Sequence, residues 1–331
     1  MTTTRERSLA DRLAELERPY SHLLEVRDET LLGRIHTWPP LHRVLPLGLA
    51  VRLARTRGRI EWRVPSRREG AIQRAISLAG PGASPREVRQ LARAHLIELA
   101  IQTELSLRPW EARRRPIRGL EHLERARDGG RGVIIATVHM GPLLNLVHAL
   151  AARGHKLYIS AGKQHDGSLV RPGDEGRWAK IQSGWVEGAG CRWVRRGGSY
   201  ELLRALLARG EICYITWDTP GRENVPVHLL GRTWHVAGNA ARLALQTGAP
   251  VVPGFSMREG NAPISVLFPG IDPSEAGGES EINARVAAAV ESALGPRLAQ
   301  ANKGIAHNHD WRPPGERLLP LHEGRPPQQG P

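Results

Sequence analysis

From residue 117 onward, the spacing of apolar positions changes repeatedly between that of a helix and that of a buried strand. Apolar residues of the helical segments recur every three or four positions, whereas the strand segments are short, continuous and mostly β-branched or aromatic. The predicted helices cover residues 117–128, 143–155, 200–210 and 240–248. The predicted strands cover residues 133–138, 156–160, 211–217 and 249–255. This alternation, with glycine at helix ends, predicts an α/β fold in which a mostly parallel central sheet is flanked by helices.

The chain before this region has helical periodicity alone, in residues 5–19 and 68–107. In the second segment Ser84 is expected to be an N-cap, followed by Pro85 and by Glu87 as its capping-box partner. The expected division is an N-terminal helical and amphipathic annex, an α/β domain and a disordered tail, over residues 1–67, 68–315 and 316–331.

Residues 38–59 combine prolines with a short apolar stretch that is bordered by arginines. Two interpretations remain open for this segment. It could lie flat on a membrane with its arginines toward the headgroups, or it could pack beneath the core.

The charge is strongly positive, because the 331 residues contain 47 Lys and Arg against 33 Asp and Glu, a net charge of +14. Nearly all of these cations are arginines, which favours phosphate-bearing partners such as an anionic membrane, nucleic acid, coenzyme A or an acidic carrier protein. Cys191 and Cys213 form neither a metal motif nor a disulfide framework, which fits a reducing cytoplasm. No secretory signal is visible, and the apolar stretch at 44–51 is too short to span a bilayer. We therefore expect a cytoplasmic protein that is soluble or peripheral at the inner membrane face.

His139 is the first candidate for catalysis, because it follows a predicted buried strand and precedes a helix expected to start near Pro142. Ligands of open α/β sheets gather at the carboxyl ends of strands, where a histidine can reach a substrate hydroxyl. Gly141 would let a substrate approach the backbone closely. A single histidine in such a place is nevertheless more often structural.

A second strand end carries Asp218, followed by a turn with Arg222. Arg195 and Arg196 precede a glycine pair and a helix whose cap is expected at Ser199, an arrangement suited to a phosphate or carboxylate. Each feature also has an ordinary explanation. Asp218 could simply begin a turn, and the arginine pair could be a solvated surface feature.

Three other kinds of site receive little support from the sequence. His307, His309 and Asp310 alternate along one segment but lack the further ligands that zinc needs, so no metal is expected. A Ser-His-Asp hydrolase is not indicated because the chain has no G-x-S-x-G motif. Nucleic-acid binding is supported by charge alone, without a recognised module, and is not expected.

Three stretches in this order resemble a known family. They are G-x-G-V-I-I-A-T-V-H-M-G, R-R-G-G-S-Y-E-L-L-R-A-L-L-A-R-G-E-I-C-Y-I-T-W-D, and V-P-V-H-L-L-G-R followed by A-R-L-A-L-Q-T-G-A-P-V-V-P-G-F. The chain thereby resembles the late acyltransferases of lipid A biosynthesis, from about residue 68 to about residue 312. These belong to the lysophospholipid acyltransferase superfamily, as do the actinobacterial phosphatidylinositol-mannoside acyltransferases. The resemblance implies a glycerolipid-acyltransferase-like fold.

The resemblance implies acyl transfer from an acyl carrier protein or coenzyme A thioester to a hydroxyl or amine of a small-molecule or lipid acceptor. No metal or further cofactor is implied, since phosphopantetheine or coenzyme A carries the acyl group as co-substrate. His139 matches the family's general base. Arg195 and Arg196 match a basic position near donor or acceptor phosphates, and Arg222 is a further substrate-binding candidate.

One position departs from the family, because the acidic residue expected five positions after the histidine is Leu144. A histidine without its carboxylate loses the group that fixes its tautomer and stabilises its imidazolium. Asp218 could substitute across neighbouring strand ends, Asn145 could orient the ring, or the acceptor could be an amine that needs less base assistance. The third explanation, with Asp218 assisting, is the one we favour.

Two hypotheses follow from the broken motif. The first is an active acyltransferase, in specialised-metabolite or glycolipid biosynthesis. The second is a catalytically inactive homologue that binds acyl chains or an anionic membrane.

Overall fold

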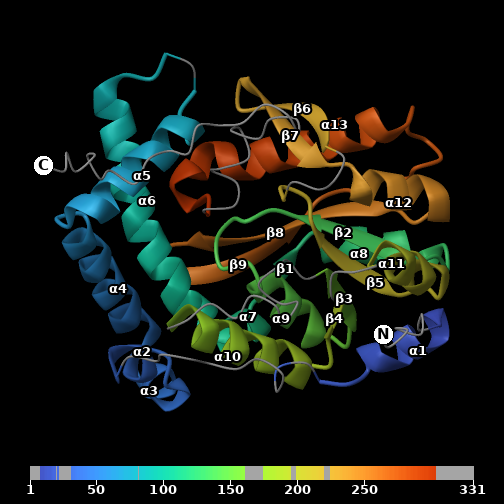
Figure 1. Ribbon diagram of the computed structural model, residues 1–331, viewed down its shortest axis with the longest axis horizontal. Helices are drawn as coiled ribbons and strands as arrows, with labels where there is room; N and C mark the ends of the chain where they lie inside the picture. The colour runs from blue at the N-terminus through green and yellow to red at the C-terminus, as the bar shows by residue number, and fades with distance from the viewer. Residues whose placement is uncertain are drawn as a thin grey trace, which may run out of the picture.

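A seven-stranded sheet forms the centre of the computed structural model, which describes residues 8–19, 21, 31–80, 82–160, 174–194, 199–219 and 224–302 (Figure 1). The strand order is β1-β9-β8-β2-β5-β3-β4, and β6 and β7 form a separate hairpin. The strands are β1 (Ile117–Arg118), β2 (Val133–Thr137), β3 (Leu157–Ser160), β4 (Arg192–Val194), β5 (Ile212–Thr216), β6 (Asn224–Leu229), β7 (Arg232–Ala237), β8 (Val251–Glu259) and β9 (Ala262–Leu267).

Helices cover the sheet on both faces and form a further layer at one side (Figure 1). Those of the N-terminal part are α1 (Leu9–Leu16), α2 (Leu31–His36), α3 (Pro39–Val44), α4 (Leu47–Glu61), α5 (Pro65–Leu78), α6 (Pro85–Ser106) and α7 (Pro109–Arg113). Those that follow are α8 (Leu120–Asp128), α9 (Asn145–Ala151), α10 (Asp174–Gly188), α11 (Ser199–Ala208), α12 (Asn239–Thr247) and α13 (Glu279–Leu294), and a 3-10 helix spans Gly295–Gln300.

The predicted mostly parallel sheet is confirmed. Strands β8, β2, β5, β3 and β4 are all parallel to one another, and each of the four predicted strands forms. The exception is the edge, where β9 is antiparallel to β8 and β1 pairs with β9. A tight turn at Gly260, which has a φ of +58°, reverses the chain there.

Both faces of the sheet are covered, so every residue of β2 is buried. Its side chains alternate between two apolar clusters: Ile134 and Ala136 belong to one, and Val133 and Ile135 belong to the other. A strand covered on both sides is expected to be continuously apolar, which is why this segment has no polar alternation. The two clusters hold the carboxyl ends of the central strands in fixed positions.

The structure corrects two predicted boundaries. Residues 117–118 begin as strand β1 rather than as the first turn of a helix, because Gly119, with a φ of +73°, separates them from α8. Helix α9 begins at Asn145 rather than near Pro142, and the carbonyl of Pro142 accepts a hydrogen bond from the backbone N–H of Asn145 (2.8 Å).

In the N-terminal part, α4, α5 and α6 form the layer on the left of Figure 1, beside the ends of β8 and β9. The capping box predicted at Ser84 and Glu87 is confirmed, with both of its reciprocal hydrogen bonds present. No helix in the described ranges has the length and apolarity that crossing a bilayer requires. The division near residue 67, which falls inside α5, stays a prediction.

A buried polar network joins α3 to α6. The ring of His42 lies 3.0 Å from Oε1 of Glu104, which also accepts a hydrogen bond from Nε of Arg108 (2.7 Å). Arg108 in turn donates to the carbonyl of Leu45 (2.9 Å). This network fixes the connection between α3 and α4 to the end of α6.

Candidate active site

The register of two parallel strands places His139 beside Asp218. Thr137 is the partner of Thr216 in the pairing of β2 with β5, and each candidate residue comes two positions after its strand ends. The backbone N–H of Trp217 donates to the carbonyl of Thr137 (2.6 Å), which extends the pairing past the last strand residues. The two side chains therefore meet at the carboxyl edge of the sheet, where ligands of such folds bind.

Asp218 makes two contacts with His139. Its Oδ1 lies 2.9 Å from Nδ1 of the ring, and its Oδ2 accepts a hydrogen bond from the backbone N–H (2.9 Å). The carboxylate is buried, with 1% of the side chain exposed, whereas 29% of the histidine side chain is exposed. One side of the ring is thus held from inside the protein while the ring remains open to solvent.

The His139 ring is more easily protonated beside Asp218 than a histidine in water is. Burial lowers the pKa of His139, but the charge of Asp218 and its hydrogen bond outweigh burial and raise that pKa above its usual value. In the neutral ring, the hydrogen on Nδ1 points to the carboxylate, which leaves the lone pair on Nε2. No described residue bonds to Nε2. This arrangement suits a general base whose cationic form is stabilised.

The turn after His139 is anchored by two buried hydroxyls from neighbouring strands. The carbonyl of Leu143 accepts hydrogen bonds from Oη of Tyr214 (3.0 Å) and Oγ of Ser256 (3.2 Å). Oγ of Ser256 also accepts from the backbone N–H of Leu146 (2.9 Å). Burial raises the pKa of the Tyr214 hydroxyl, so it stays protonated as a donor. Neither residue is recognisable as a functional one from the sequence, since each lies inside an apolar strand.

Gly141 occupies a conformation that few other residues tolerate, with a φ of +56°. A Cβ at this position would lie 2.9 Å from Cα of Met257 and closer still to the backbone oxygen of Ser256. The glycine therefore lets the turn pack directly against β8. Its predicted contact with substrate stays a prediction.

The segment at 300–302 holds the same turn from the other side. The carbonyl of Gln300 accepts a hydrogen bond from the backbone N–H of Gly141 (3.0 Å), and the N–H of Asn302 donates to the carbonyl of His139 (2.7 Å). The side chain of Gln102 on α6 donates to the same carbonyl of Gln300 (2.8 Å). No local pattern in the sequence indicates this contact, because the segments are far apart in the chain.

Leu144, where the family's acidic residue is missing, directly precedes α9, and Asn145, the alternative partner considered for the ring, is the first residue of that helix. Leu144 is half-buried and packs against the apolar cluster that contains Ile135. Asn145 is 1% exposed, and its Nδ2 has no hydrogen-bond partner among the described residues. The contact to the ring of His139 comes instead from Asp218.

The remaining candidates lie outside the described residues. Arg195 and Arg196 come directly after β4, and Arg222 comes after Asp218 in the chain. His307, His309 and Asp310, considered above as metal ligands, also fall outside. Within the described part of the chain, no group of three or more His, Cys, Asp or Glu side chains could hold a metal ion.

Comparison with known proteins assigns the chain to a family. A family model described as bacterial lipid A biosynthesis acyltransferase matches residues 42–300, which include both His139 and Asp218. Among solved structures, the crystal structure of the 1-acyl-sn-glycerophosphate (LPA) acyltransferase PlsC from Thermotoga maritima matches with a TM-score of 0.36 and 12% identity, over 64% of this chain and 83% of that one. No curated protein matches the chain.

Proposed function

The chain belongs to the bacterial lipid A biosynthesis acyltransferase family and is an acyltransferase, and from this premise we propose its donor, its base and its surroundings. The donor is a thioester, carried on coenzyme A or on the phosphopantetheine of an acyl carrier protein. The acceptor is a hydroxyl or an amine of a glycolipid or of a specialised metabolite. His139 is the general base.

The reaction follows from the free Nε2 of His139. Nε2 removes the proton of the acceptor O–H or N–H as the heteroatom attacks the thioester carbonyl carbon. The tetrahedral intermediate then collapses, the C–S bond breaks, and the thiolate takes the proton back from the imidazolium. The products are an ester or amide and a free thiol, so neither oxidant nor reductant is needed.

The observation that carries this proposal is the contact between His139 and Asp218. Asp218 supplies the carboxylate that the family places five positions after the histidine and that Leu144 cannot provide. It keeps the Nδ1–H tautomer and stabilises the imidazolium formed during transfer. With Asp218 as its partner, His139 can activate an acceptor that is a weak nucleophile, so the acceptor can be a hydroxyl as well as an amine.

The surface of α4 supports a location at an anionic membrane. Leu49, Leu53 and Ile60 are 46%, 54% and 55% exposed on one face of this helix, and the exposed Arg52 and Arg59 lie beside that face. Exposed apolar side chains bordered by arginines are typical of helices that lie in the membrane interface. We place the protein at the inner membrane face, where acyl carrier protein and coenzyme A thioesters are available.

Release of free thiol from acyl carrier protein and coenzyme A thioesters, with and without hydroxyl and amine acceptors, tests the activity. The wild-type protein is expected to release thiol in proportion to acylated acceptor. His139→Ala should lose about 10²- to 10⁴-fold of this rate, the usual contribution of general base catalysis. Full activity in His139→Ala would remove the base from the mechanism.

Leu144→Glu distinguishes the two possible carboxylate positions. Because Asp218 already contacts Nδ1 of His139, Leu144→Glu should not raise the rate of acyl transfer. The same substitution should also not restore the rate that Asp218→Asn loses.

Leu144 also favours a second function, a homologue that binds acyl chains or anionic membrane without catalysis. That function predicts binding of acyl thioesters by the wild-type protein with no thiol release for any acceptor.

A further inference from the structure

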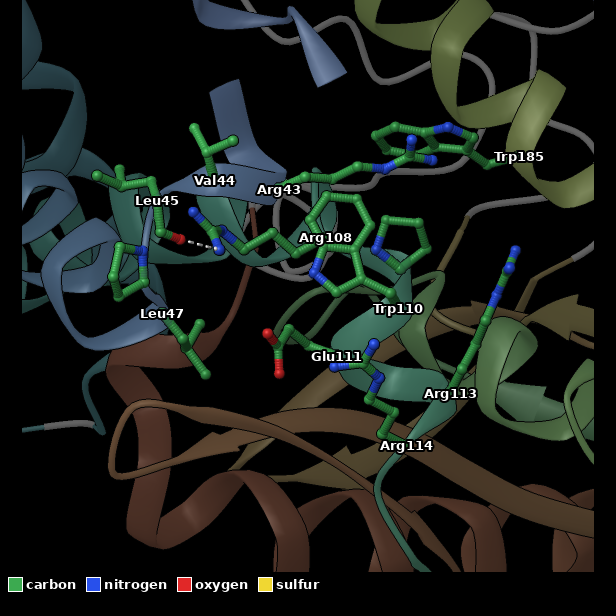
Figure 2. A pocket seen from close by; sticks show the side chains of 12 residues that line it. Arg43, Val44, Leu45, Leu47, Arg108, Trp110, Glu111, Arg113, Arg114 and Trp185 are labelled. Carbon is green, nitrogen blue, oxygen red and sulfur yellow. Dashed lines mark hydrogen bonds between the residues drawn. The ribbon is translucent and has the colours of Figure 1, made fainter. Parts of the chain in front are cut away.

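A second feature of the molecule is a pocket of about 450 Å³ between the N-terminal layer and α7 (Figure 2). Its walls are the connection from α3 to α4, the segment from the end of α6 through α7, and one side chain of α10. Neither His139 nor Asp218 lines it. The volume is that of a small-ligand site.

Three exposed arginines, Arg43, Arg113 and Arg114, give this pocket its charge. None of them forms an ion pair with another residue of the described part of the chain. The acidic side chain in the lining is Glu111. Guanidinium groups without carboxylate partners are suited to a phosphate, which each can bind through two parallel hydrogen bonds.

The wall beside them contains Arg108, which is 1% exposed and held in place. Its Nε donates to Glu104 and its Nη1 donates to the carbonyl of Leu45, as Figure 2 shows for the second bond. Its Nη2 has no acceptor among the described residues. The charge of this guanidinium is paired with Glu104, but its unused N–H is a fixed hydrogen-bond donor in the pocket wall.

Two half-buried indoles complete the lining. The guanidinium of Arg43 lies 5.7 Å from the centre of the Trp110 ring, and Trp185 of α10 lies on the same side of the pocket (Figure 2). Aromatic faces beside arginines fit a ligand that carries a planar or apolar group next to its phosphate. Inorganic phosphate alone would leave these faces unused.

We propose that this pocket binds the phosphate ester of a reactant. Two sources share this chemistry: the adenosine phosphates of coenzyme A, and the headgroup of an anionic phospholipid. The second would reach the pocket from the exposed face of α4, since Val44 in the pocket wall is 77% exposed and precedes that helix. The choice of these two sources rests on the proposed acyl transfer. The proposal that the pocket binds an anion rests on the pocket residues alone.

Direct binding measurements test this proposal. Adenosine 3′,5′-bisphosphate and inorganic phosphate are titrated by calorimetry, and phosphatidylglycerol vesicles are tested by co-sedimentation. The variant is Arg43→Ala with Arg113→Ala and Arg114→Ala. The control variant removes the same charge at three exposed arginines elsewhere, Arg86→Ala with Arg93→Ala and Arg209→Ala.

The pocket variant should lose at least about tenfold in affinity for its ligand, since loss of one charged hydrogen bond already has that effect. The control should change affinity much less. Pocket-dependent binding of the bisphosphate identifies the coenzyme as the source, and pocket-dependent binding of vesicles identifies the lipid. Absence of wild-type binding to all three probes, or equal losses in pocket and control variants, overturns the proposal.

Two further measurements separate this proposal from the proposed function. His139→Ala should lose acyl transfer and keep pocket-dependent binding, so failure of the enzymatic proposal leaves the anion site testable. Thermal unfolding of the pocket variant checks that it folds. If the triple variant does not fold, the three single variants replace it, since each changes an exposed position. Each single variant should weaken binding by a part of the combined loss.

Discussion

Asp218 binds His139 through both of its carboxylate oxygens, one on the backbone N–H and one on Nδ1 of the ring, each at 2.9 Å. The backbone bond fixes the plane of the carboxylate, so the second oxygen can hold the ring in one orientation. Because Asp218 is 1% exposed, water does not compete effectively for it. The pair therefore combines a fixed geometry with a charge that favours the imidazolium.

Asp218→Asn should lower kcat and also shift its pH dependence. The amide keeps the size of the side chain but removes the charge that raises the pKa of His139. Because a general base acts when neutral, the rate of the wild-type protein should rise with pH through that raised pKa. In the variant this limb should move to lower pH while the plateau falls, by up to about 10²- to 10⁴-fold.

Rates of acyl transfer between about pH 5 and pH 9 check this prediction, together with an NMR titration of the His139 ring. His139→Ala is the control, because its low rate should have no such limb. A lower plateau with an unmoved limb would mean that Asp218 only supports the fold.

Much of this site could be predicted from the sequence, because its two central residues follow buried strands. The apolar runs before His139 and Asp218 identify two carboxyl strand ends, which share one edge of a parallel sheet. Their adjacency could not be predicted, since β3 and β4 lie between these strands in the chain and the order of strands depends on packing. The register that aligns Thr137 with Thr216 likewise needs the assembled sheet.

The support around the site was not predictable for a related reason. Tyr214 and Ser256 resemble ordinary strand residues, and they become anchors because they meet the carbonyl of Leu143 in three dimensions. Gln300 reaches Gly141 from a distant part of the chain. Local periodicity carries no information on such contacts, whereas a local motif such as the capping box at Ser84 was predicted correctly.

Gly141→Ala should destabilise the protein more than the same substitution at Gly260. Both glycines have a positive φ, of +56° and +58°, at which alanine costs about 1–2 kcal/mol. A Cβ at Gly260 meets nothing within 4 Å, whereas at Gly141 it would collide with the backbone of Ser256. The difference in the free energy of unfolding between these variants therefore measures the clash.

Urea unfolding of both variants checks this prediction, and acyl transfer should fall only in Gly141→Ala because the turn carries His139. Equal stabilities would show that β8 moves aside to accept the methyl group. Equal loss of activity would mean that the substitution acts through general destabilisation.

Glu104→Gln should destabilise the protein at neutral pH and lose this effect in acid. Burial alone raises the pKa of Glu104, but hydrogen bonds from His42 and Arg108 and their charges lower it from 4.5 to about 2. A lowered pKa stabilises the folded state above pH 4.5, and this contribution is lost as the pH falls through 2. Removing the charge also leaves Arg108 buried without its partner, so the cost at pH 7 should be about 3–5 kcal/mol.

Urea unfolding of the wild-type protein and the variant at several values between pH 7 and pH 2 follows this loss. Glu201→Gln is the control, since its exposed pair with Arg204 is solvated and should contribute little at any pH. A stability difference that stays constant down to pH 2 would show that the ionised carboxylate is not what joins α3 to α6.

Serine at Leu49, Leu53 and Ile60 should weaken binding to anionic vesicles. The three side chains are about half exposed on one face of α4, and full burial of each would contribute about 1.5–3 kcal/mol. Partial burial of one such side chain in the membrane then raises the affinity for vesicles by up to about tenfold. The triple variant loses all three contributions, so its affinity should fall more than tenfold. Leu245→Ser is the control, because this residue is 42% exposed on α12, away from the N-terminal layer.

Co-sedimentation with phosphatidylglycerol vesicles at low and high salt separates the two components of this binding. Attraction of anionic lipid by the arginines beside the apolar face should be screened by salt, whereas the contribution of the apolar side chains should persist. The triple variant should therefore keep a weak, fully salt-sensitive association, and Leu245→Ser should behave as the wild-type protein does. If the triple variant and the wild-type protein bind equally at high salt, α4 does not enter the membrane interface and its exposed face serves another partner.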